Sequence, residues 1–209
     1  QDYEEILAWI NRGDGTFEKQ LVSERQEPSF GSSGIELVDL DGDGDLDLLY
    51  TNGDTFDSRQ AKPYHGVQWL ENTGGYPYKL HRLADMIGCY RALAADFDQD
   101  GDLDLVAGAF LPNDLLDEPP LAQHDSLILL EQTERGRFER HAITQGEFNH
   151  ASLEVADFDH DGRPDIAAGI FLRHPQPSQP RVILWKNRPL RRPEQAQRSS
   201  GSPPFPVAK

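Results

Sequence analysis

The residues with the clearest chemistry are the aspartates of the stretch "DLDGDGDLD" at 39–47. Aspartate occupies every odd position of these nine residues. Two unit charges about 4 Å apart repel by roughly 1 kcal/mol even in water, and by more where water is excluded. The stretch therefore predicts either a fully solvated loop or a site where a cation offsets the charge.

The same spacing recurs twice, as "DFDQDGDLD" at 96–104 and "DFDHDGRPD" at 157–165. Each copy reads D-x-D-x-D-G-x-x-D, while the residues between the shared positions vary. A loop that is merely solvated does not require a fixed spacing of its aspartates. In a tight loop, however, alternate carboxylates can converge on one point, and the glycine permits the sharp turn. Calcium takes about six to eight oxygen ligands, and magnesium prefers to keep its waters. The sequence therefore predicts three Ca²⁺ ions, one in each Asp loop.

An EF-hand loop begins with the same residues, but it needs a glutamate at position twelve and a helix on each side. Position twelve is Tyr50, Ala107 and Ala168 in the three copies. The flanking segments are short, apolar and strand-like. The sequence therefore excludes an EF-hand.

A second motif lies between the Asp loops and reads "ILAWINRGDGTF" (6–17), "GVQWLENTGGYPY" (66–78), "SLILLEQTERGRF" (126–138) and "RVILWKNR" (181–188). Together the two motifs define a repeat of about 60 residues with four short extended segments. Four short strands per repeat are typical of a β-propeller blade. The predicted fold class is therefore all-β, a partial β-propeller of about three to four four-stranded antiparallel blades.

The predicted blades fill residues 1–187, as a half blade at 5–23 and blades at 34–84, 90–143 and 150–187. The last of them lacks a fourth strand after Asn187, so we expect further blades upstream or in a partner chain. Residues 188–209 are rich in Pro, Arg and Ser and predict a flexible tail.

The three Asp loops and the "WINRGDGTF" segment at 9–17 resemble the FG-GAP/VCBS repeat family, which includes the integrin α-chain propellers. The resemblance covers about residues 5–187 and implies one calcium in each loop between strands one and two of a blade. It implies side-chain ligands at positions one, three, five and nine: Asp39, Asp41, Asp43 and Asp47; Asp96, Asp98, Asp100 and Asp104; Asp157, Asp159, Asp161 and Asp165. It implies a backbone carbonyl ligand at position seven, which is Asp45, Asp102 or Arg163.

Charge and composition limit the partners. The formal net charge is −16, which disfavours nucleic acid and anionic membranes, since both reward Lys and Arg. No apolar run approaches the roughly 18 residues that a membrane span requires. The millimolar calcium that such loops need is found outside the cell. We therefore expect an extracytoplasmic protein, secreted, periplasmic or at the cell surface.

The long insertions at 52–65, 111–125 and 172–180 all follow the second strand of a predicted blade, so they are expected on the face opposite the calcium loops. Long loops on a rigid scaffold are where binding usually resides. A protein or carbohydrate ligand is expected there. The polar candidates on this face, all expected to be exposed, are Arg59, Tyr64, His65, Arg91, His124, His150, Arg173 and His174.

No G-x-S-x-G, P-loop or paired catalytic carboxylates outside the Asp loops occur, so the chain is not expected to be an enzyme. The predicted function is a calcium-binding propeller module for protein interaction, as in cell adhesion, or glycan interaction, in which calcium is structural. The alternative is an accessory or C-terminal propeller of a larger polysaccharide-active or cytochrome-linked enzyme whose catalytic part lies upstream.

Overall fold

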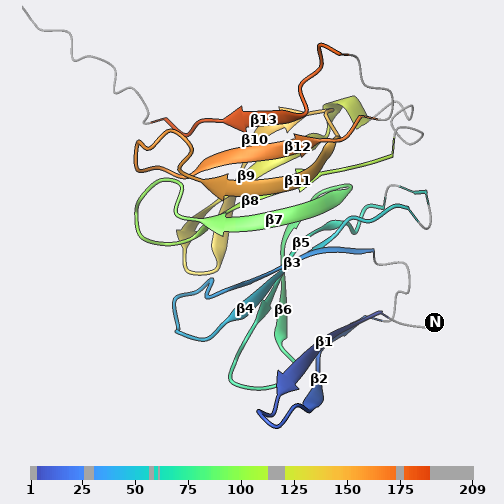
Figure 1. Ribbon diagram of the computed structural model, residues 1–209, viewed down its shortest axis with the longest axis vertical. Coiled ribbons are helices and arrows are strands. Elements are labelled where there is room, and N and C mark those ends of the chain that lie inside the picture. Colours follow the sequence, from blue (N-terminus) through green and yellow to red (C-terminus); the bar gives the residue numbers. More distant parts are fainter. Residues whose placement is uncertain are drawn as a thin grey trace, which may run out of the picture.

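Four antiparallel sheets make up the computed structural model, which describes residues 4–25, 31–56, 59–60, 62–112, 121–172 and 177–188 (Figure 1). The first sheet pairs β1 (Glu4–Asn11) with β2 (Phe17–Arg25). The second contains β3 (Ser32–Val38), β4 (Asp47–Asn52), β5 (Gly66–Glu71) and β6 (Lys79–Asp85). The third contains β7 (Cys89–Ala95), β8 (Asp104–Ala109), β9 (Asp125–Glu134) and β10 (Arg137–Gln145), and the fourth β11 (His150–Ala156), β12 (Asp165–Ile170) and β13 (Val182–Trp185).

Strands that follow one another in the chain are neighbours in each sheet, so every sheet is a meander. The turn between β1 and β2 shows why the local sequence reverses the chain. The Gly13 amide donates to Oδ1 of Asn11 at 2.8 Å, and the Thr16 amide donates to Oδ1 of Asp14 at 2.9 Å. Such short polar side chains favour turns because they satisfy backbone donors that would otherwise have no partner.

The core lies between consecutive sheets, in three apolar clusters. Val22 of the first sheet packs with Leu48, Tyr50 and Leu70 of the second. A larger cluster, which includes Trp69 and Leu105, joins the second and third sheets. A third cluster, which includes Leu93 and Ile166, joins the third and fourth sheets.

The second strand of each larger sheet is the most buried element. All residues of β4 and β8 are buried, because these strands have a paired strand on each edge and a neighbouring sheet on each face. This explains the apolar run that follows each Asp loop. The first strands of the second, third and fourth sheets lie side by side: β3 contacts β7, and β7 contacts β11.

The predicted fold class is confirmed: the protein is all-β, with four-stranded antiparallel sheets arranged as part of a propeller. The last sheet has three strands among the described residues. The predicted tail at 188–209 lies, from residue 189 onward, outside the described residues. In the ranges that the structure describes, no helix has the length and apolar character needed to cross a bilayer.

Candidate metal centres

Each Asp loop connects the first strand of a sheet to the second. In Figure 1 the three loops lie on the left, and the ends of β4, β8 and β12 point to the right. In each loop, one carboxylate oxygen from each of three aspartates lies within 4.8 Å of the other two. The three groups are Asp39, Asp41 and Asp43; Asp96, Asp98 and Asp104; and Asp157, Asp159 and Asp165. Three hard oxygen donors at this separation could hold a metal ion in each loop.

These groups contain positions one and three of every loop but differ in the third member. Asp47, Asp100 and Asp161, which the family resemblance implies as ligands, lie outside the three groups. The side chain of Asp45, at position seven, is exposed to solvent. The full ligand set, including the position-seven carbonyls of Asp45, Asp102 and Arg163, therefore stays a prediction.

The position-one aspartate organises each loop. Oδ1 of Asp39 accepts the Asp43 amide at 3.1 Å, and Oδ2 accepts the Gly44 amide at 3.0 Å. Asp96 and Asp157 accept the matching two amides of their own loops. Gly44 has a φ of 95°, a conformation that L side chains rarely adopt. The conserved spacing within the chain therefore reflects a turn built around one carboxylate.

The position-nine aspartate connects the loop to the third strand. Asp104 is 1% exposed; its Oδ2 accepts the Phe97 amide at 2.9 Å and its Oδ1 accepts the Gln132 amide at 2.8 Å. The same pair of bonds recurs at Asp47, to Leu40 and Asn72, and at Asp165, to Phe158 and Asn187. This aspartate is therefore a structural link, whether or not it also binds a metal ion.

Sequence reasoning missed the role of the polar residue near the end of the third strand in the second, third and fourth sheets. Besides their backbone bonds, Asn72 donates its side-chain amide to Leu46 O at 3.3 Å, and Gln132 donates to Leu103 O at 3.1 Å. Asn187 donates to Phe97 O at 2.6 Å. The signal was present as the repeated "WLEN", "LLEQ" and "LWKN".

The electrostatics of the loops favour a bound cation. Burial raises the pKa of Asp47 and of Asp104. Burial and the neighbouring Asp100, Asp104 and Asp98 raise the pKa of Asp102 to about 6. Within the described part of the chain, Oδ1 of Asp159 is buried without a hydrogen-bond partner. A hard cation prefers carboxylate oxygens as ligands, and it would also give the buried oxygen of Asp159 a partner.

Two cationic side chains lie on these carboxylates. Nη2 of Arg135, in the turn between β9 and β10, is 2.8 Å from Oδ2 of Asp41 and 3.9 Å from Oδ2 of Asp43. Nζ of Lys186, just after β13, is 3.0 Å from Oδ2 of Asp159, and this contact lowers the pKa of Asp159. Sequence analysis identified neither, because both lie far along the chain from the loops that they reach.

Neighbouring loops also touch one another. Nε2 of Gln99 in the second loop donates to Gly162 O in the third at 2.8 Å. A cavity of about 300 Å³ lies between the first and second loops, lined by Asp41, Asp102 and Arg135 among others. The three candidate metal centres therefore form one row across the second, third and fourth sheets.

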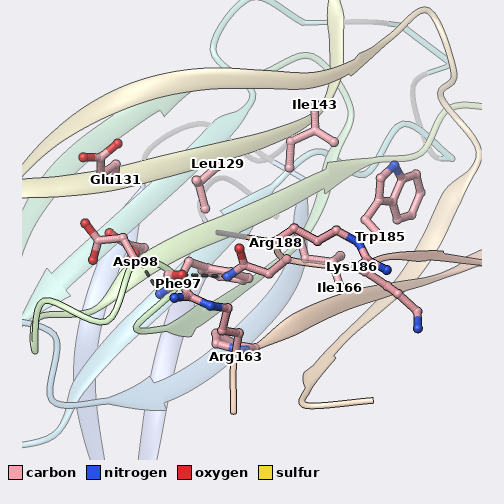
Figure 2. Close-up of a pocket in the computed structure, with 13 residues that line it drawn as sticks. Phe97, Asp98, Leu129, Glu131, Ile143, Arg163, Ile166, Trp185, Lys186 and Arg188 are labelled. Carbon is pink, nitrogen blue, oxygen red and sulfur yellow. Dashed lines mark hydrogen bonds between the residues drawn. The ribbon is translucent and has the colours of Figure 1, made fainter. Parts of the chain in front are cut away.

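A larger cavity of about 580 Å³ opens between the third and fourth sheets on the side of the Asp loops (Figure 2). Its apolar wall includes Leu129, Ile143 and Trp185, and charged side chains surround it. The charged residues are Asp98, Asp104, Glu131, Arg163, Lys186 and Arg188.

The expectation of exposed polar residues on the opposite face is wrong for two histidines. His65 and His150 are fully buried. The Gly88 amide donates to Nδ1 of His65 at 3.3 Å, and burial lowers the pKa of His65 to about 4. Nδ1 of His150 lies 3.1 Å from Ser126 O. Arg173 and His174 lie outside the described residues.

An aromatic row occupies that face instead. We use this name for Tyr90 of β7 and for Phe56, Phe110 and Phe171, which follow β4, β8 and β12. The ring centroid of Phe110 lies 5.7 Å from that of Phe56, 5.5 Å from that of Tyr90 and 5.4 Å from that of Phe171. Phe110 is buried, whereas Phe56 and Phe171 are 54% and 53% exposed.

A meander of four-stranded sheets, with an aspartate loop after each first strand, defines a propeller-type module. Comparison with known families agrees: residues 1–50 match the model described as the FG-GAP-like repeat, which confirms the family resemblance. No curated protein matches the chain.

Proposed function

We propose that this chain is a non-catalytic, calcium-binding propeller module of an extracytoplasmic protein. The observation that carries the proposal is that each of three Asp loops brings together three aspartates, which always include those at positions one and three. One such group has many explanations, but three at the same place in three sheets share one cause. Many hard oxygen donors in a flexible loop suit calcium better than magnesium.

The ions have a structural role in this proposal. Each would be held by the grouped aspartates of its loop and would neutralise carboxylates that otherwise repel one another. The position-nine aspartate joins the same loop to the third strand. An ion in the loop therefore stabilises the junction of three strands rather than a surface loop alone.

The experiment is thermal unfolding with calcium, with magnesium at the same concentration, and with a chelator. Extracellular modules bind calcium with Kd of about 10⁻⁴–10⁻³ M. At free calcium tenfold above Kd, each site adds about 1.4 kcal/mol to stability, so three independent sites add about 4 kcal/mol. We expect a Tm several degrees higher in calcium than in chelator. An unchanged Tm, or equal rescue by magnesium, would contradict the proposal.

A protein or carbohydrate ligand is proposed on the face opposite the Asp loops, and the aromatic row supports it. The exposed rings of Phe56 and Phe171 lie on either side of the buried Phe110. Exposed aromatic side chains are common in binding surfaces. A glycan array and a protein pull-down with the wild type and the Phe56→Ala/Phe171→Ala variant test this surface. Binding that survives the double substitution would place the ligand elsewhere.

A further inference from the structure

Two of the three Asp loops carry an ion pair on the same ligand position, and the third does not. Position three is Asp41 in the first loop, paired with Arg135, and Asp159 in the third, paired with Lys186. Position three of the second loop is Asp98. Over the described ranges, no Lys or Arg nitrogen lies within 4 Å of a carboxylate oxygen of the second loop. Among the described residues, two of the loops are thus paired with a cation at position three and one is not.

Arg135 reaches the first loop from a different sheet. It lies in the turn between β9 and β10, and this turn packs on the second sheet: a Cβ added to Gly136 would lie 3.1 Å from the Trp69 ring. The Asp41 side chain is 3% exposed, whereas that of Arg135 is 62% exposed. The carboxylate therefore lies buried beneath a guanidinium that is largely exposed to solvent.

Lys186 has a similar arrangement within the fourth sheet. It follows β13, and its side chain is 40% exposed, against 21% for Asp159. Figure 2 shows Lys186 at the edge of the large cavity, next to Arg188 and Trp185. As in the first loop, a partly exposed cationic group covers a carboxylate that belongs to the candidate metal group.

A cation at this position opposes the metal in two ways. It takes a lone pair of the position-three carboxylate, and it repels a divalent ion a few ångströms away. From these contacts we infer that Arg135 and Lys186 are competitors built into the chain, which lower the calcium affinity of the first and third loops. The second loop consequently fills first as calcium rises. The inference rests on the proposed function, because it concerns the affinities of the same three loops.

The experiment is a calcium titration followed by amide NMR of the full chain, with one reporter in each loop. The reporters are Gly44, Gly101 and Gly162, whose amides donate to the position-one aspartates of the three loops. In the wild type we expect the Gly101 signal to reach its midpoint at the lowest calcium concentration. In Arg135→Gln the Gly44 midpoint should fall about fivefold or more at low salt, with Gly101 unchanged. Lys186→Gln should shift Gly162 alone.

The matched control is Arg137→Gln, which removes the same charge two residues away, from a side chain paired with Glu134. It should leave the Gly44 midpoint within twofold of the wild type. A second readout is Tm: in chelator Arg135→Gln should unfold at a lower temperature than the wild type, and its gain on adding calcium should be larger.

The outcomes separate the two claims. Midpoints that do not change in Arg135→Gln, or a Gly44 midpoint that rises because Arg135 orients Asp41 for the metal, would overturn the inference and leave the metal centres intact. No calcium-dependent shift at any of the three glycines would overturn the proposed function and this inference with it.

Discussion

At the scale of single residues, one aspartate position supports the fold independently of any metal ion. The position-nine aspartate was predicted as a metal ligand, and its spacing indicated nothing more. The structure shows that both of its oxygens accept backbone amides from two different segments and that the residue is buried. Its contribution to the stability of the fold therefore does not require a bound metal ion.

Replacing Asp104 with alanine should destabilise the protein even in chelator. The substitution leaves the amides of Phe97 and Gln132 buried without acceptors, at about 1–3 kcal/mol each. We expect a loss of about 2–5 kcal/mol in urea unfolding. Asp102→Ala, in the same loop, should cost nothing in chelator, since it removes a carboxylate whose pKa is raised by burial and by its neighbours. Equal losses for the two variants would contradict the structural role of position nine.

The buried His65 predicts a pH dependence. Burial, aided by Lys62 and Arg82, lowers its pKa from the ordinary 6.5 to about 4. Between these values the unfolded chain binds a proton that the folded chain does not, so stability falls as pH drops from 6.5 towards 4. We expect the wild type to lose about 3 kcal/mol more than His65→Gln over this range in urea unfolding at fixed ionic strength. Parallel pH profiles would refute the assignment.

Local sequence could not predict the burial of His65 and His150. Histidine is intermediate between the usually buried and the usually exposed residue types, so the packing of neighbouring sheets decides its burial. The aspartate loops could be predicted because their pattern depends on spacing along nine residues, which the sequence shows directly.

At the scale of elements, the strands and their order followed from the sequence, and the contacts between sheets did not. Each Asp loop marks the end of one strand and the start of the next, so the meander could be predicted. The approach of Gly53, after β4, to Cys89 of β7 involves residues far apart in the chain. A Cβ added to Gly53 would lie 2.1 Å from Cys89 O, closer than any real contact.

Gly53→Ala should therefore push the second and third sheets apart. Overpacking of this kind typically costs about 1–3 kcal/mol. Gly75→Ala is the matched control, because a Cβ there meets nothing within 4 Å and the residue has no positive φ. We expect a lower Tm for the first variant only. A Tm of Gly53→Ala equal to that of the wild type would show that the second and third sheets can separate at this point without loss of stability.

At the scale of the whole molecule, the repeat predicted the propeller architecture, and the row of candidate metal centres follows from it. Because each sheet repeats the same first loop, consecutive loops lie side by side, as the bond from Gln99 to Gly162 shows. Arg135 does not belong to the repeated motif. It comes from the turn between β9 and β10 of the third sheet and contacts the Asp loop of the second sheet. Its role depends on how sheets pack, which the repeat pattern does not encode.

The central claim is that the three Asp loops are three calcium sites, and equilibrium dialysis with calcium tests it most directly. The account predicts about three ions bound per chain near 10 mM free calcium, and about two in each of Asp41→Asn, Asp98→Asn and Asp159→Asn. Asp45→Asn, which changes an exposed position-seven side chain, should still bind three. Fewer than one ion per wild-type chain, or a stoichiometry that none of the three position-three substitutions changes, would contradict it.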